Sequence, residues 1–249
     1  MTMRQLVFGA IFGAVSALPA TALDLQSMTD EERAIFREEV RAYLMENPEV
    51  IMEAVAVLEE REAAAQAQTD LSLVSDNASD IFDDGYSWVG GNPDGDITLV
   101  EFLDYRCGFC KRAHDEVAKL LEADGNIRLI VKEFPILGEQ SLLASRFAVA
   151  TKQVAGNDAY KSMADALMEL SGNVDIRTLK RLAGAYGLDA DAIEAHMNSE
   201  EVTAEIRATR ALAQKLQITG TPTFVLQDEL LRGFLPFDQM LALVDEKRG

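Results

Sequence analysis

The chain has 249 residues, of which 48% are hydrophobic, and its formal net charge at pH 7 is -19. So acidic a chain repels nucleic-acid phosphates and anionic lipid, which excludes both as electrostatic partners. A chain of this length can bury a sizeable core without disulfide staples. Its two cysteines are too few for a disulfide framework, so they need another explanation.

The first residues are typical of an export signal. Arg4 precedes an apolar run of about 15 residues, and Ala20-Thr21-Ala22 has the small-x-small form of a cleavage site. A membrane anchor would need roughly 20 apolar residues. We therefore expect residues 1–22 to be a signal peptide whose removal changes the net charge to about -20. The mature protein is expected in the periplasm, soluble or envelope-associated.

Residues 28–68 are rich in Ala, Glu and Arg and contain no glycine. A capping box at Thr29 predicts the start of one helix, and Asn47-Pro48 predicts the start of a second. Both helices carry apolar stripes, formed by Ile35, Phe36, Val40, Tyr43 and Leu44 and by Val50, Ile51, Ala54, Val55 and Leu58. So short a pair cannot form a core alone. We therefore expect residues 23–68 to pack on the main domain or on further copies of the chain.

Residues 69–85 are polar, acidic and rich in turn formers, which predicts a linker. Beyond it the pattern is mixed α/β. The predicted strands are 97–103, 127–134, 223–226 and 229–233. The predicted helices are 107–121, 140–154, 158–170, 175–186, 201–216 and 237 to about 247.

Both cysteines lie where the strand 97–103 gives way to a helix. A helix N-terminus offers Cys107 unpaired amide donors and the positive end of the helix dipole, which favour a thiolate. The thiolate is the attacking species in disulfide exchange. Cys110 lies one turn further in, within reach to close a disulfide, and is expected to be more buried. The pair therefore indicates a nucleophile and a resolving thiol.

Other roles of a C-x-x-C pair fit less well. Covalent haem attachment needs C-x-x-C-H, and Lys111 stands at the histidine position. Structural zinc needs four ligands, and an inert disulfide across so short a loop would stabilise the fold little. His114 follows Cys110 by four residues, so a soft-metal site remains an alternative, and with it a copper-binding or metal-tolerance module. A solvent-facing histidine is the favoured interpretation.

Several motifs together resemble one family. They are "VEFLDYRCGFC", "VKEFPILG" and "GTPTFVL". Residues 86–249 are similar to the DsbA family of thioredoxin-fold thiol-disulfide oxidoreductases. The "ENPEVI" helices resemble those of its ScsC-like members, which carry an N-terminal oligomerisation segment, so the resemblance implies that residues 23–68 are a helical oligomerisation segment. The resemblance implies an α/β thioredoxin-like fold with a helical insertion at about 139–217, preceded by the N-terminal helices. It also implies a redox-active disulfide as the working group, with no cofactor and no metal.

The resemblance implies roles for single residues. Cys107 would attack and Cys110 would resolve. Thr221-Pro222 matches the family's cis-proline pair, with the Thr221 backbone available to an extended substrate. Glu101 stands where the family often has a buried carboxylate that relays protons to the resolving thiol. Burial would raise its pKa; an edge-strand carboxylate facing water remains open, and Lys132 is its candidate charge partner.

Gly108-Phe109 departs from the Pro-His dipeptide of the strongly oxidising members and resembles those of oligomeric disulfide isomerases. Gly108, Phe109 and Thr221 are the expected substrate contacts, although Phe109 could also be a packing residue. We therefore expect an exported thiol-disulfide oxidoreductase, leaning to isomerase or reductase. Its partners would be unfolded or misoxidised exported proteins, a membrane redox protein and further copies of itself. A monomeric dithiol oxidase and a holdase using the N-terminal stripes are the remaining alternatives.

Overall fold

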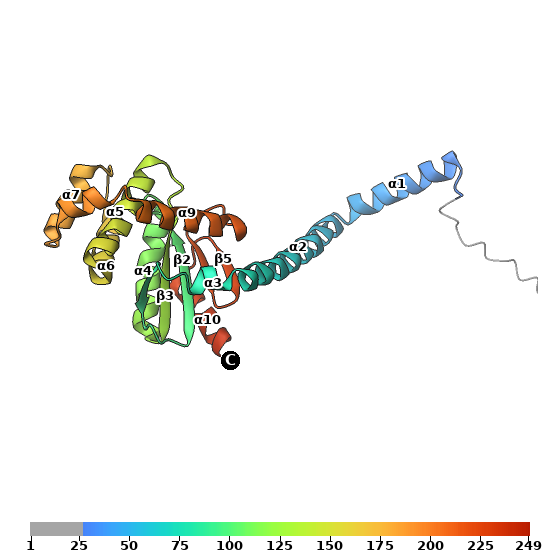
Figure 1. Cartoon of the computed structure of the whole chain (residues 1–249). Coiled ribbons are helices and arrows are strands. Elements are labelled where there is room, and N and C mark those ends of the chain that lie inside the picture. Colours follow the sequence, from blue (N-terminus) through green and yellow to red (C-terminus); the bar gives the residue numbers. More distant parts are fainter. Residues whose placement is uncertain (1–26) are drawn as a thin grey trace, which may run out of the picture. The chain divides into compact units, whose positions relative to one another are not determined.

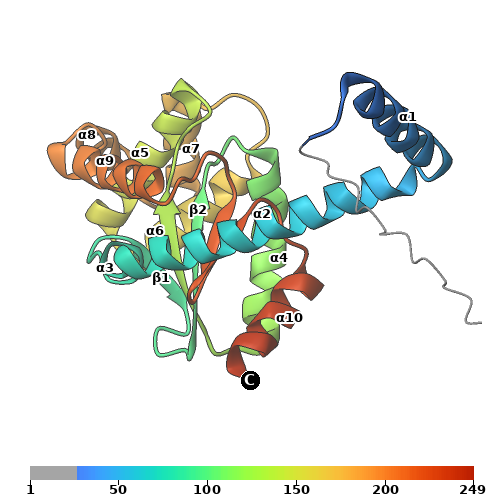
Figure 2. The ribbon, with the colours of Figure 1, turned by 90° about the vertical axis from the view of Figure 1, so that its right-hand side faces the viewer.

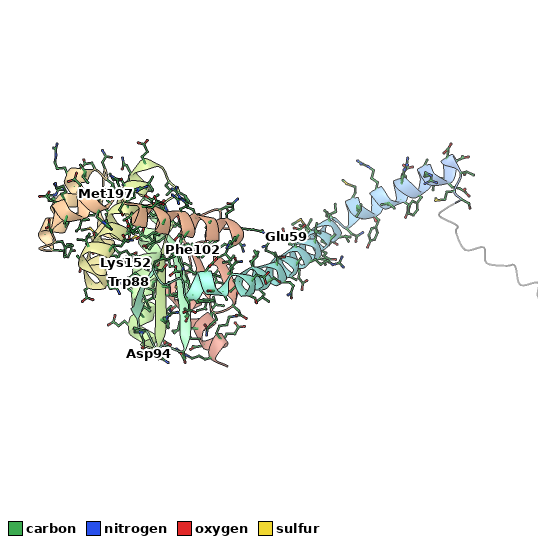
Figure 3. The ribbon with its side chains drawn as sticks, in the orientation of Figure 1. Glu59, Trp88, Asp94, Phe102, Lys152 and Met197 are labelled. Carbon is green, nitrogen blue, oxygen red and sulfur yellow. The ribbon has the colours of Figure 1, made fainter. Side chains whose placement is uncertain are left out.

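The computed structural model describes residues 27–249, so the expected signal peptide lies outside the described residues. The chain divides into two compact units, Met1–Glu59 and Glu60–Gly249. Glu59, the last residue of the first unit, is labelled in Figure 3. This division falls inside the segment 23–68 that the sequence predicts as one piece. Within residues 27–249, no helix is long and apolar enough to cross a membrane.

The first unit contains helix α1 (Asp30–Glu46) and the beginning of helix α2 (Glu49–Asp76). The predicted capping box is present: the Glu32 N–H donates to the Thr29 hydroxyl at 3.3 Å, and the Thr29 N–H donates to the Glu32 carboxylate at 2.8 Å. Both predicted helix starts are thus confirmed to within a few residues. α1 buries none of its residues, so its apolar stripe is exposed in the described chain.

The second unit is built on a five-stranded sheet in the order β1-β3-β2-β4-β5. Its strands are β1 (Trp88–Gly91), β2 (Ile97–Leu103), β3 (Ile127–Glu133), β4 (Thr223–Leu226) and β5 (Glu229–Arg232). β2 and β3 are parallel, whereas the other neighbouring pairs are antiparallel. β2 therefore lies inside the sheet, between β3 and β4. The sequence does not predict β1, because two of its four residues are glycines.

Helices surround this sheet. α4 (Gly108–Asp124) connects β2 to β3, and α10 (Phe237–Arg248) ends the chain beside α4, as Figures 1 and 2 show. The insertion between β3 and β4 contains α5 (Glu139–Ala155), α6 (Asn157–Glu169), α7 (Ile176–Ala185), α8 (Ala190–His196) and α9 (Glu200–Lys215). The predicted α/β fold with a helical insertion is confirmed, although the short α8 is missed.

Apolar side chains cover both faces of the sheet, because successive strand residues point to opposite faces. On one face, Leu103 and Val131 pack in a core that includes α4, α6 and Met197 at the end of α8. On the other face, Val100 and Phe102 pack against the C-terminal part of α9. Phe102 and Met197 are labelled in Figure 3.

The predicted linker at 69–85 is wrong in its secondary structure. α2 continues to Asp76, and α3 (Ala78–Phe82) follows. Val74 and Ile81 are 2% and 0% exposed and belong to the core around Phe102. Two apolar residues seven positions apart make this contact. Composition predicts a linker here because the residues between them are mainly Asp, Ser and Asn.

Candidate active site

The two cysteines stand at the start of α4, as predicted. Cys107 is the N-cap residue, and Cys110 lies in the first turn. Their exposed fractions are 7% and 0%, so the expected resolving thiol is the more buried one. Both are free thiols in this structure. Burial raises the pKa of the Cys110 thiol, and the nearby Glu101 carboxylate adds to the rise, while the Asp104 N–H opposes it.

A loop from the distant end of the chain lies against Cys107. The Cys107 thiol donates to the Thr221 carbonyl at 3.1 Å, across 114 residues of sequence. The Thr221–Pro222 peptide bond is cis, as the resemblance implies. The loop is fixed by the sheet, because Thr223 at the start of β4 pairs with Phe102 of β2. The Gly233 N–H, directly after β5, also donates to the Pro222 carbonyl at 3.0 Å.

Glu101 is a buried carboxylate of the central strand β2. It is 3% exposed, and its Oε1 atom has no hydrogen-bond partner within residues 27–249. Burial raises the pKa of Glu101 to about 7; His114 lowers it and Glu133 raises it. The alternative of an edge-strand carboxylate facing water is therefore wrong.

Lys132 is not the charge partner of Glu101. In the parallel register, Val131 lies opposite Glu101, and Lys132 lies opposite Phe102. Side chains alternate along a strand, so Lys132 points to the other face of the sheet. There its ammonium group pairs with Asp84 and donates to the Asp80 carbonyl at 2.9 Å. The sequence could not show this, because a one-residue change of register exchanges the two faces.

Asp104, which the sequence analysis does not single out, organises the loops around the cysteines. It is fully buried. One carboxylate oxygen accepts the Arg106 N–H at 2.7 Å, and the other accepts the N–H groups of Ile136 and Leu137 at 2.8 and 3.0 Å. Its own N–H donates to the Cys110 sulfur at 3.5 Å. Asp104 thus joins the β2–α4 turn to the segment that follows β3.

A second buried carboxylate, Glu133, ends β3 within the "VKEFPILG" motif. Its Oε1 atom accepts hydrogen bonds from the Tyr105 and Tyr160 hydroxyls at 2.6 and 2.7 Å. Burial raises the pKa of Glu133 to about 7, although both hydroxyls oppose the rise. Since Glu133 also raises the pKa of Glu101, the two carboxyl groups influence each other's ionisation.

The residues between the cysteines meet solvent. Phe109 is 53% exposed, and the Arg112 guanidinium lies over its ring at 4.4 Å from the centroid. A Cβ built on Gly108 would have no heavy atom within 4 Å, so packing does not require glycine at this position. The Phe109 ring is therefore exposed beside the cysteines and is not part of the core.

His114 faces solvent only in part, because its side chain is half-buried against a partner. Its Nε2 atom lies 3.1 Å from the Asp165 carboxylate of α6, and the two side chains are 28% and 32% exposed. In the part of the chain that the structure describes, no three His, Cys, Asp or Glu side chains are grouped to hold a metal ion.

Comparison with known proteins identifies the domain around this site. The family described as DSBA-like thioredoxin domain matches residues 98–245, which include Cys107, Cys110 and Pro222. The chain belongs to this family. A second family, the copper resistance protein ScsC N-terminal domain, matches residues 32–65. The resemblance stated from the sequence is confirmed for both parts, and with it the thioredoxin-like fold.

This DSBA-like chain is similar to solved structures of thiol-disulfide oxidoreductases and, in sequence, to part of an antiporter. A thioredoxin-like oxidoreductase from Silicibacter pomeroyi DSS-3 is 44% identical, with a TM-score of 0.65 over 68% of this chain and 96% of that one. The thiol-disulfide exchange protein alpha-DsbA2 from Wolbachia pipientis is 27% identical, with a TM-score of 0.69 over 74% and 98%. The Na⁺/H⁺ antiporter NhaA 3 of Salinispora tropica is 26% identical over 156 residues, 63% of this chain and 24% of the antiporter. The chain thus spans about a quarter of that relative's length.

Proposed function

We propose that this DSBA-like protein exchanges disulfides with cysteines of other exported proteins. The observation that carries the proposal is the position of the Cys107 thiol. It lies at the N-terminus of α4, hydrogen-bonded to the Thr221 carbonyl beside the cis Pro222, while Cys110 is fully buried one turn further along. A helix N-terminus favours the attacking thiolate. The burial of Cys110 reserves the second thiol for the intramolecular step.

Reduction of a substrate disulfide would take two exchanges. The Cys107 thiolate attacks one substrate sulfur, and the other leaves as a thiolate, which gives a mixed disulfide. Cys110 then loses its proton, and its thiolate attacks the Cys107 sulfur. The bound substrate sulfur leaves as a thiolate, and a Cys107–Cys110 disulfide remains. Two electrons pass to the substrate, and oxidation of a substrate dithiol is the reverse.

In this scheme Glu101 is the proton acceptor for Cys110. Burial raises the pKa of the Cys110 thiol, so its thiolate is scarce without a base. Glu101 is close enough to influence that ionisation, and its own pKa is raised to about 7. A base is most effective when its pKa lies near the working pH. The substrate contacts would be Phe109, which is exposed, and the backbone of Thr221, with Gly108 leaving room.

We also propose that residues 28–68 join copies of this chain. The stripe of the first helix is exposed, at 64% for Ile35, 42% for Phe36, 41% for Val40 and 54% for Tyr43. In α2, Ile51, Val55 and Leu58 are exposed as well. Contiguous exposed apolar surface of this kind marks an interaction site. Identical helices offer identical stripes, and the match to the ScsC N-terminal domain supports self-association.

Joined copies favour isomerase or reductase activity over oxidation. In an oligomer the Cys107–Cys110 pairs of several copies would act on one substrate. A membrane partner that re-oxidises single domains would have poorer access to each pair. The exposed Phe109 beside Cys107 suits an unfolded or misoxidised substrate in the periplasm. The alternative, a monomeric dithiol oxidase, would lack these constraints and would have a strongly oxidising reduction potential.

Deletion of residues 28–68 tests the assembly and its effect together. The truncated protein should have the mass of a monomer in solution and should lose most of its ability to refold a substrate with scrambled disulfides. Full-length Cys107→Ser is the matched control, since it should keep the mass and lose the activity. If truncation leaves both the number of copies per particle and the refolding activity unchanged, the proposed role of these helices is wrong. Measuring the Cys107–Cys110 reduction potential separates the isomerase from the oxidase.

A further inference from the structure

A cavity of about 260 Å³ opens beside Glu101, on the sheet face covered by α4 and α6. Its wall is mainly apolar, with Trp88, Leu103, Val117 and Val131 among the lining residues. Five ionisable groups also line it: Glu101 of β2, His114 of α4, and Tyr160, Lys161 and Asp165 of α6. The proposed exchange reaction uses only the first of these.

Glu101 needs a second proton partner if it serves Cys110. Each catalytic cycle moves one proton between the Cys110 thiol and Glu101, so Glu101 must also exchange protons with solvent. At 3% exposure its carboxyl group has almost no direct contact with bulk water. Its Oε1 atom has no partner within residues 27–249 and is therefore free to bind water in the cavity.

The half-buried pair of His114 and Asp165 lies between this cavity and the surface. The Nε2 atom of His114 is 3.1 Å from the Asp165 carboxylate. Lys161, whose side chain is 49% exposed, pairs with the same carboxylate from the solvent side of α6. The volume of the cavity can hold several water molecules, which occupy about 30 Å³ each in the liquid. Its ionisable groups supply the polar partners that such water requires.

We propose that His114, held by Asp165, is the proton exit of Glu101, and that water in the cavity connects them. The inference rests on the proposed exchange reaction. The proton passes from the Cys110 sulfur to the Glu101 carboxylate, through water to the neutral His114 imidazole, and then to bulk solvent. The reverse path returns it when Cys110 leaves as a thiolate. His114 is a positioning and relay residue, because it touches neither sulfur.

The charges around His114 fit this role. The Asp165 carboxylate, 3.1 Å from Nε2, raises the pKa of His114 above its usual value. Burial opposes the rise, the Glu101 carboxylate supports it, and Lys161 opposes it. In turn, the His114 charge lowers the pKa of Glu101. Ionisation of Glu101 therefore favours protonation of His114, which is the coupling that a two-group relay needs. Glu133 acts on this pair through Glu101.

The decisive variants are His114→Gln and Asp165→Asn, with His196→Gln as the matched control. His196 is the only other histidine of the chain, and it contacts Gln153. The first readout is infrared titration of the Glu101 carboxyl group in the reduced full-length protein, identified by its absence in Glu101→Gln. We expect His114→Gln to raise the pKa of Glu101, and His196→Gln to leave it unchanged. This readout needs no substrate and no turnover.

The second readout is the rate at which Cys110 releases glutathione from a mixed disulfide on Cys107, measured against pH. A lost acid-base group should slow this release at least about tenfold in His114→Gln and move its pH midpoint upward. Asp165→Asn should have a smaller effect in the same direction. Imidazole added to His114→Ala should restore the rate in proportion to its concentration, which a structural role for His114 would not produce.

The outcomes separate this inference from the exchange reaction itself. If the wild type and the His114 variants release glutathione with the same rates and pH profile, the proton exit is wrong, and the exchange reaction stands. If Cys110→Ala, which cannot resolve the adduct, forms no mixed disulfide on Cys107, the exchange reaction is wrong. The infrared titration does not depend on the exchange reaction. If the pKa of Glu101 is unchanged in both His114→Gln and Asp165→Asn, the coupling of His114 to Glu101 is wrong.

Discussion

The carboxyl group of Glu101 should lower the stability of the reduced protein above neutral pH, and Glu101→Gln tests this. Burial raises the pKa of Glu101 from 4.5 to about 7 in the folded protein. Below pH 4.5 the group is protonated in both the folded and the unfolded state, so it contributes no difference. Between the two values the unfolded chain loses its proton first, because the folded protein binds the proton more tightly. The free energy of unfolding therefore falls as the pH rises through this window.

The size of the effect follows from the two pKa values. One pKa unit corresponds to about 1.4 kcal/mol, so full ionisation of Glu101 lowers the free energy of unfolding by about 3 kcal/mol at pH 8. Gln keeps the size of the side chain and cannot ionise. The free energy of unfolding of Glu101→Gln, relative to wild type, should thus rise by about 3 kcal/mol between pH 4.5 and pH 8. Part of the wild-type pH dependence should remain, because Glu133 titrates in the same range.

Urea unfolding under reducing conditions at several pH values is the appropriate assay. Trp88, the only tryptophan of the chain, is 7% exposed and offers a fluorescence signal for loss of the sheet. Glu122→Gln on the exposed side of α4 is the control and should follow the wild-type curve. Equal pH dependence for Glu101→Gln and wild type would refute the assignment of Glu101 as a buried, readily protonated carboxyl group.

Three further results are expected. Asp104→Ala leaves three backbone N–H groups without their acceptor and should lower the free energy of unfolding by about 3 kcal/mol in urea titrations; a change close to zero would mean that water replaces the carboxylate. Phe109→His places an imidazole near Cys107 that stabilises its thiolate when protonated, so the reduction potential should become about 30 mV more oxidising in glutathione equilibria at about pH 6; an unchanged potential would mean that the new side chain does not act on Cys107. Asp70→Asn weakens the paired hydrogen bonds to Arg232, so residues 66–76 should exchange amide hydrogens faster; wild-type exchange there would show that apolar contacts alone hold this part of α2.

Elements with strong periodic patterns could be predicted from the sequence. The strand 97–103 has the predicted bounds in the structure because its apolar run is bordered by Asp96 and Asp104. α8 has seven residues, too few for a clear apolar period, and it is missed. The helical part of residues 69–85 is missed because Val74 and Ile81 are isolated apolar residues among polar ones. Their burial depends on a sheet face that forms from distant segments.

The residues of the candidate site likewise divide into those with a local sequence signal and those whose contacts depend on distant segments. Cys107 and Cys110 could be placed because a local motif fixes them at a helix start, and Thr221-Pro222 because the family resemblance supplies the distant loop. The partner of Glu101 could not be predicted, since the register of β2 and β3 decides which residues share its face. Asp104 has a local signal, because an aspartate before a tight turn often accepts backbone N–H groups. Nothing in the sequence shows that His114 meets Asp165 of α6 at the edge of a cavity.

The central claim is that Cys107 forms a mixed disulfide with a substrate and that Cys110 resolves it. Intact-mass measurement of Cys110→Ala mixed with a peptide disulfide tests this claim directly. The account predicts one stable peptide adduct on Cys107, whereas the wild type should end as the Cys107–Cys110 disulfide with free peptide thiol. Failure of Cys110→Ala to form any adduct, or an equal adduct in Cys107→Ala, would contradict it.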